Sequence, residues 1–220
     1  MNTEEVLNRR ILKTSLRMFY RKGFSRVTTQ DIAASIGISK KTLYQYFPSK
    51  NEIVLAALRA NFEGLGKKVD VLFDNPEMSF EARFTALLSI LSVQINSISF
   101  LLIEDIHKYL PEAWEIIDTF RREKVLNRLI VLIREGQRQG FVRQSLDIDT
   151  VLFLIFNIIT QVLRPEILIS EGRSIHSIFL TLINLIYGGL FIPESFKMLT
   201  YTGEISKLEE LYDKEGVFID

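Results

Sequence analysis

The chain contains no cysteine, and this absence removes several classes of protein at once. Without thiols there are no disulfides, no cysteine nucleophile and no thiolate ligands for zinc or iron–sulfur clusters. Histidine is also scarce: the 2 histidines, His107 and His176, lie far apart and lack the ligand spacing of motifs such as HExxH. We therefore expect no metal and no other cofactor.

Proline and glycine are few, with 5 and 11 among 220 residues, and no segment alternates apolar and polar residues between hairpin turns. Long helices are therefore favoured over many short strands, and the expected fold class is all-α. A hydrophobic content of 47% with 25% charged residues is ordinary for a globular protein. The N-terminus carries charges at Glu4, Glu5, Arg9 and Arg10 instead of an apolar signal segment, which predicts a cytoplasmic protein.

The net charge of zero conceals an uneven distribution along the chain. Residues 1–60 hold 11 Lys and Arg but only 4 Asp and Glu, whereas residues 61–220 hold 16 and 23. A basic beginning followed by an acidic remainder predicts that the first part meets a polyanion and the rest does not.

Residues 28–50 read TTQDIAASIGISKKTLYQYFPSK and predict a helix-turn-helix. Thr28 and Asp31 have the spacing of a capping box, so a short helix should begin at residue 29. Gly37 stands where a left-handed residue ends a helix at little cost, and Ser39 can cap the next helix. Pro48 should end that second helix.

The second short helix has an apolar face and a basic one. Leu43 and Phe47 are four residues apart and should face inward together. Such helix pairs also occur in proteins that bind no nucleic acid. Residues 39–50, however, contain three lysines and no acid, which favours DNA binding. The side chains expected to point outward are Lys40, Lys41, Tyr44, Gln45 and Tyr46.

The same residues resemble the N-terminal DNA-binding domain of the TetR family of bacterial regulators. The pattern that carries the resemblance is T-T-x-D-I-A-x-x-x-G-[IV]-S-x-x-T-L-Y-x-Y-F-x-S-K, and the similarity extends over roughly residues 8–58. It implies a three-helix DNA-binding head followed by a helical ligand-binding and dimerisation domain. The boundary we expect divides the chain into residues 1–50 and 51–220.

The candidate DNA contacts differ in their expected roles. Lys50, at the start of a helix, offers an ammonium beside a positive helix end, which suits a phosphate. Thr29 and Tyr44 can donate hydroxyls to phosphates, and the resemblance implies the same. It also implies that the second helix reads base edges. The full set is Thr29, Gln30, Lys40, Lys41, Thr42, Tyr44, Gln45, Tyr46 and Lys50.

The rest of the chain predicts further helices. Gly64 and Gly66 lie inside the one that begins at Lys50, where they mark either a bend or a local break. Pro165 should kink or end a later helix. The role of the tail, residues 193–220, is not predicted beyond one short helix. The expected helices cover residues 4–22, 50–73, 80–98, 99–109, 111–138, 150–163, 174–191 and 206–214.

The last two long helices are apolar around most of their circumference, so each must be covered on more than one side. A homodimer would provide that cover, as the resemblance also implies, although two core helices of a monomer would give the same pattern. A two-fold dimer would match a palindromic or near-palindromic DNA operator. The residues assigned to dimerisation are Phe156, Ile159, Phe179, Leu182, Ile183 and Ile186.

By resemblance, the second domain would bind a small effector molecule, and the abundance of Ile, Leu and Phe favours a hydrophobic one. Polar or amphipathic candidates among the apolar helices are Gln94, Glu104, His107, Trp114, Asn157 and Gln161.

Two other classes of protein compete with the regulator. Glu104, Asp105 and His107 are the only cluster that resembles acid–base machinery, but they lack a nucleophile, a phosphate loop or a metal set. Residues 84–103 and 174–193 are uncharged over 20 positions, as a membrane span would be. Both windows are interrupted by polar residues. We therefore expect neither an enzyme nor a membrane protein.

Overall fold

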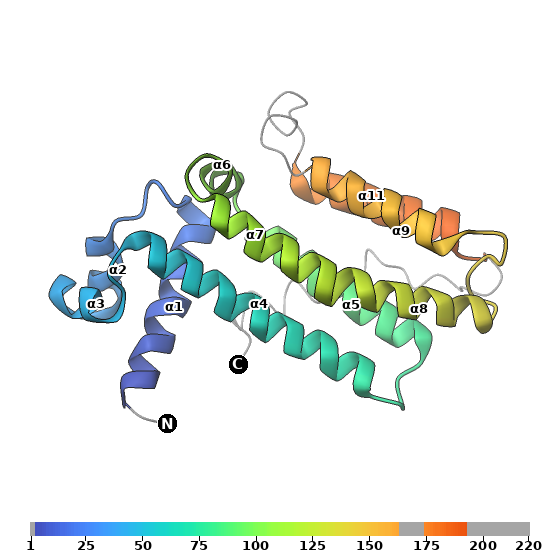
Figure 1. The fold of residues 1–220 in the computed structure, drawn as a ribbon, viewed down its shortest axis with the longest axis horizontal. Coiled ribbons are helices and arrows are strands. Elements are labelled where there is room, and N and C mark those ends of the chain that lie inside the picture. Colours follow the sequence, from blue (N-terminus) through green and yellow to red (C-terminus); the bar gives the residue numbers. More distant parts are fainter. Residues whose placement is uncertain (1–2, 163–173, 193–220) are drawn as a thin grey trace. The chain divides into compact units, whose positions relative to one another are not determined.

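In the computed structural model, the described residues are 3–162 and 174–192, and almost all of them lie in helices (Figure 1). The expectation of an all-α fold is therefore confirmed. The chain forms two compact units. Within the described residues, the first unit comprises residues 3–65 and 97–119, and the second comprises residues 66–96, 120–162 and 174–192.

The first unit begins with three helices, α1 (Thr3–Lys22), α2 (Thr29–Ile36) and α3 (Lys40–Tyr46). It also contains the first part of α4 (Lys50–Asp74), all of α6 (Phe100–Tyr109) and α7 (Pro111–Phe120) as far as residue 119. Its core consists of fully buried apolar side chains, since each helix has one apolar face that points inward. These include Ile11, Leu16, Phe19, Val27, Ile32, Ala33, Leu43, Ile53 and Val54.

The second unit contains the rest of α4, then α5 (Phe80–Ser97), η1 (Arg121–Leu126), α8 (Asn127–Arg138), α9 (Ile148–Val162) and α11 (Ile175–Leu190). Four phenylalanine rings contact one another in its core. The ring of Phe80 lies 5.2 Å from that of Phe141, and the ring of Phe84 lies 5.0 Å from that of Phe191. A β-bridge between Val142 and Phe191 joins the end of α8 to the end of α11.

The observed helices follow the sequence expectation closely, with two differences. The helix expected over residues 111–138 is continuous, but its middle, Arg121–Leu126, is a π-helix. The local break considered at Gly64 and Gly66 is wrong, because α4 runs through both residues without interruption. The two units nevertheless divide between Leu65 and Gly66. Pro165 and the short helix expected over residues 206–214 lie outside the described residues.

Among the described residues, no single helix is long and apolar enough to cross a membrane. By length and composition alone, the segments Phe80–Ile95 and Phe100–Tyr109 pass the test only as a bent pair.

Candidate nucleic-acid interface

The helix-turn-helix starts with a complete capping box. The Thr28 amide donates to Asp31 Oδ2 at 2.9 Å, and the Asp31 amide donates to Thr28 Oγ1 at 3.1 Å. Because the Thr28 hydrogen bonds favour the charged carboxylate, the pKa of Asp31 is held below its usual value. Gly37 ends α2 in the left-handed conformation, with φ 77° and ψ 33°.

The second helix is fixed by a cap and by two buried side chains. Ser39 Oγ accepts a hydrogen bond from the Thr42 amide at 2.9 Å and lies 2.8 Å from Thr42 Oγ1. Leu43 is fully buried and Phe47 is 8% exposed. This anchoring leaves α3 only one face to present to solvent.

The face that α3 presents is basic and aromatic. Lys40, Lys41 and Gln45 are exposed, and Tyr44 is 42% exposed. The Lys40 ammonium lies 5.7 Å from the centre of the Tyr44 ring, within the range of a cation–π interaction. The Tyr44 hydroxyl lies 3.4 Å from Thr29 Oγ1 on α2, so the two hydroxyls expected to contact phosphates are neighbours.

The remaining candidates lie around this face. Gln30 is exposed at the start of α2, and Tyr46 is half-buried at the end of α3. The Thr42 hydroxyl belongs to the cap of α3, so its first role is to hold the helix. These assignments to DNA stay predictions.

Lys50 has a partner that its sequence position did not indicate. Its ammonium donates to the carbonyls of Phe24 and Val27, each at 3.0 Å, and lies 4.0 Å from the centre of the Phe24 ring. Burial lowers the pKa of Lys50, while the nearby charge of Asp105 opposes that shift. The phosphate contact stays a prediction, and it would be made by a group that already donates two hydrogen bonds.

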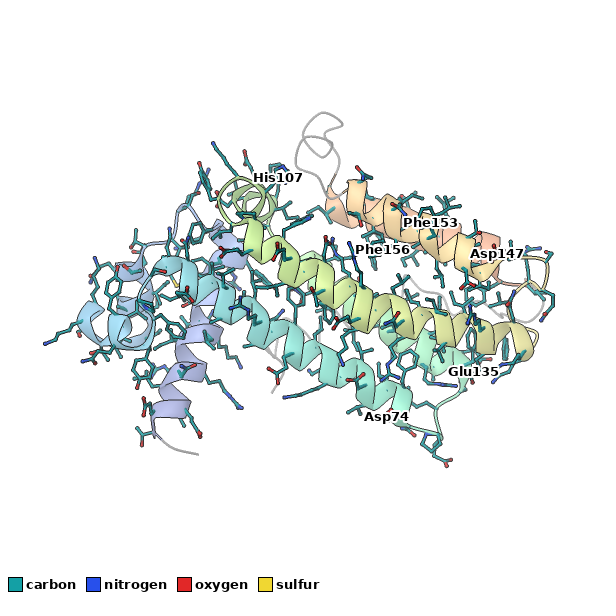
Figure 2. The ribbon with its side chains drawn as sticks, in the orientation of Figure 1. Asp74, His107, Glu135, Asp147, Phe153 and Phe156 are labelled. Atoms are coloured by element: carbon teal, nitrogen blue, oxygen red, sulfur yellow. The ribbon has the colours of Figure 1, made fainter. Side chains whose placement is uncertain are left out.

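Asp105 also belongs to this unit, a role that sequence reasoning missed. Its Oδ2 accepts from the Ser25 amide at 2.8 Å and from Ser25 Oγ at 3.0 Å, and the residue is 7% exposed. Its neighbours Glu104 and His107 are exposed on α6, where Figure 2 labels His107. The three residues therefore do not converge as acid–base machinery would require. No local pattern could have revealed the Ser25 partner.

The residues assigned to dimerisation are of two kinds. Phe179, Leu182 and Ile183 are 7%, 8% and 2% exposed, so they belong to the core of their own chain. Phe156, Ile159 and Ile186 are half-buried. Figure 2 labels Phe153 and Phe156 on α9. The large apolar side chains that α9 and α11 leave exposed are others: Phe153, Leu154, Ile158 and Leu185.

The candidate effector residues are divided between the two units. Gln94 is 7% exposed in the second unit, where Asn157 and Gln161 are exposed on α9. Glu104, His107 and the half-buried Trp114 belong to the first unit. Sequence reasoning overlooked two buried hydroxyls on α5, Thr85 Oγ1 and Ser92 Oγ, which have no hydrogen-bond partner among the described residues.

Two capped helices, a glycine turn and an exposed basic second helix define a helix-turn-helix DNA-binding protein. Residues 11–57 match the family described as "Bacterial regulatory proteins, tetR family". The DNA-binding part of this chain is therefore that of a TetR-family transcriptional regulator.

Similarity to other transcriptional regulators extends beyond these residues. The HTH-type transcriptional regulator YvaF of Bacillus subtilis is 24% identical over 86% of this chain and 97% of its own length. The HTH-type transcriptional repressor KstR2 of Mycolicibacterium smegmatis is 26% identical over 64% of this chain and 70% of its own length.

Among solved structures, a transcriptional regulator from Saccharomonospora viridis in complex with choline has a TM-score of 0.65. It is 24% identical and is matched over 86% of this chain and 99% of that one. A likeness at this identity establishes the fold and not the ligand.

Proposed function

We propose that this protein is a homodimeric repressor that binds a palindromic or near-palindromic operator and is released from it by a small hydrophobic molecule. The observation that carries the proposal is the anchored helix α3, whose exposed side chains include Lys40, Lys41, Tyr44 and Gln45 and no acid. A rigid helix with such a face can enter a major groove and meet phosphates and base edges together.

The side chains of this face would make two kinds of DNA contact, to base edges and to the backbone. Gln45 can pair with adenine, and Lys40 or Lys41 can donate to guanine, so these residues are candidates for reading sequence. Thr29 and Tyr44 offer neighbouring hydroxyls, 3.4 Å apart, that would donate to the backbone and set the register. The specificity of the complex would therefore reside in a few positions of α3.

The dimer would be formed through α9 and α11. Phe153 on α9 is 64% exposed and Leu185 on α11 is 68% exposed, and burying large apolar side chains against a second chain is favourable. Pairing the same surface of two chains along a two-fold axis would bury it and present two α3 helices to successive half-sites.

The effector is proposed to bind in the second unit, where Phe, Leu and Ile dominate the core. Thr85 and Ser92 add two buried hydroxyls without partners among the described residues. An effector with an apolar body and one hydrogen-bonding group would suit this composition, because buried polar groups gain most from a partner.

The proposal is tested by titrating the purified protein into the duplex that flanks its own gene, followed by fluorescence anisotropy across a salt series. A shuffled duplex of the same composition is the control. We expect tight binding to the first duplex only, two chains per site and a steep loss of affinity with salt, because several phosphates are neutralised.

Equal binding to both duplexes would place the operator elsewhere and call for selection from genomic fragments. Failure to bind any fragment, even at low salt, would contradict the proposed function.

A further inference from the structure

A buried carboxylate holds the turn that leads into the helix-turn-helix. The turn, residues 23–28, connects α1 to α2. Asp105 on α6 reaches it across 80 positions of sequence and accepts two hydrogen bonds from Ser25, one from the amide and one from the hydroxyl. Hydrogen bonds to an ionised acceptor are about twice as strong as neutral ones. The turn therefore has a strong attachment to α6.

The backbone of the turn is shaped to admit this carboxylate. Gly23 has φ +80°, and a Cβ on it would lie 2.7 Å from Asp105 Oδ2 and 3.0 Å from Leu101 Cβ. A side chain at this position would force Asp105 or Leu101 to shift, and the left-handed φ also favours glycine. Nearby, the Ser99 amide donates to the Tyr20 carbonyl at 3.0 Å, which ties the start of α6 to the end of α1.

The turn is also held from α4. The Lys50 ammonium donates to the carbonyls of Phe24 and Val27, while Asp105 accepts from the amide of Ser25 between them. An acid on α6 thus accepts hydrogen bonds from the turn, and a base on α4 donates hydrogen bonds to its carbonyls. Thr28, the N-cap of α2, follows directly, so the placement of α2 and α3 depends on both attachments.

We propose that Asp105 is a positioning residue for DNA reading: by holding Ser25 it sets the placement of α2 and α3, and operator affinity depends on this attachment. The proposal rests on the DNA-binding function proposed above and adds to it a residue on α6 that acts through the turn. Asp105 touches no DNA in this scheme.

The test compares three variants for operator affinity. Asp105→Ala removes the acceptor, Asp105→Asn keeps an acceptor oxygen but loses the charge, and Glu104→Ala removes an exposed acid one position away on the same helix. Loss of an acid normally helps DNA binding, because a charge that repels phosphate is gone. Electrostatics alone therefore predicts that all three variants bind as tightly as the wild type or more tightly.

The proposal predicts instead that substitution of Asp105 weakens operator binding, whereas substitution of Glu104 does not. We expect Asp105→Ala to raise the operator Kd roughly tenfold, since strong hydrogen bonds to a charged acceptor are lost. Asp105→Asn should recover part of the affinity, and Glu104→Ala should lose none. Ser25→Ala should weaken operator binding when it is made in the wild type. The same change should have no further effect when it is added to Asp105→Ala, because the acceptor of the Ser25 hydroxyl is already absent.

A second readout does not depend on DNA. Amide hydrogen exchange at Ser25 should accelerate in Asp105→Ala and remain unchanged in Glu104→Ala, with both variants folded and dimeric as judged by circular dichroism and sedimentation. Unchanged exchange at Ser25 would overturn the attachment itself. Faster exchange at Ser25 with unchanged operator affinity would show that Asp105 has no role in DNA binding. A wild type that binds no duplex would instead refute the proposed function.

Discussion

Two serines on α5 differ in a way that a stability measurement can detect. Ser89 Oγ donates to the Thr85 carbonyl at 2.8 Å, whereas Ser92 Oγ has no partner among the described residues although Ser92 is only 1% exposed. Ser92→Ala should therefore raise the free energy of unfolding by about 1 kcal/mol, because an unpaired buried hydroxyl is costly. Ser89→Ala, the control, should leave stability unchanged or lower it. Urea unfolding measures the stability of both variants. A larger loss of stability in Ser92→Ala than in Ser89→Ala would contradict an unpaired Ser92 hydroxyl.

Asp31 makes the stability of the DNA-binding unit depend on pH. Its pKa in the folded protein lies below the ordinary value of 3.8, first because of the side-chain hydrogen bond with Thr28. A lowered carboxylate pKa stabilises the fold above the ordinary value, and this contribution is lost as pH falls through the folded pKa. Asp31→Asn should thus melt below the wild type at pH 7, and the two should converge as the pH drops below 3.8. A constant difference in melting temperature across that range would contradict it.

Residues that act locally could be predicted from the sequence, and residues that act at long range could not. Thr28 and Asp31 are three positions apart, so their spacing alone specifies the capping box that the structure contains. Ser25 and Asp105 are 80 positions apart, so no local spacing indicates that the two residues are partners. Lys50 has the same limitation, because its carbonyl partners are set by tertiary packing.

At the scale of helices, Gly64 and Gly66 provide a matched pair inside α4. A Cβ at Gly64 would meet nothing within 4 Å, whereas one at Gly66 would lie 3.3 Å from the Lys124 side chain. Gly64→Ala should stabilise the protein by roughly 0.5–1 kcal/mol, since alanine restricts the unfolded chain and favours a helix. Gly66→Ala should gain less, because Lys124 must move. Thermal unfolding of the two variants compares them, and destabilisation by Gly64→Ala would contradict a regular helix there.

The π-helix shows why helix interiors are harder to predict than helix ends. Ser39 caps α3 as the sequence suggested, and Ser99 caps α6, which begins within one residue of the expected start. The π-helical segment Arg121–Leu126 has no such marker, because it continues the helix on both sides. Within it, Lys124 donates to Asp70 at 2.9 Å, and Arg128 on α8 donates to the same carboxylate at 2.7 Å. These partners become visible only in three dimensions.

For the whole molecule, the dimer is the feature most open to test. Leu185 on α11 and Val71 on α4 are almost equally exposed, at 68% and 69%. If the proposed dimer surface is right, Leu185→Glu should yield monomers, because a charge cannot be buried there unpaired. Val71→Glu should remain dimeric. Analytical ultracentrifugation decides between them, and a dimeric Leu185→Glu would refute this surface.

Sequence alone assigned the dimer to α9 and α11, and three of the six side chains that it selected are buried in the core of their own chain. The helices are so apolar that periodicity does not distinguish the face toward the core from the face left exposed. Packing resolves this: Ile183 is 2% exposed and Leu185, two positions later, is 68% exposed. The choice of face therefore needed the tertiary structure.

The measurement that bears most directly on α3 as the recognition helix is a comparison of Gln45→Ala with Tyr44→Phe on operator duplexes mutated one base pair at a time. We expect Gln45→Ala to lose discrimination at one position per half-site, worth roughly 1–3 kcal/mol, because a base contact is removed. Tyr44→Phe should weaken binding to every duplex by the same factor, because only a backbone contact is lost. If both variants keep the full wild-type preference at every base pair and the wild-type affinity, α3 does not read the operator.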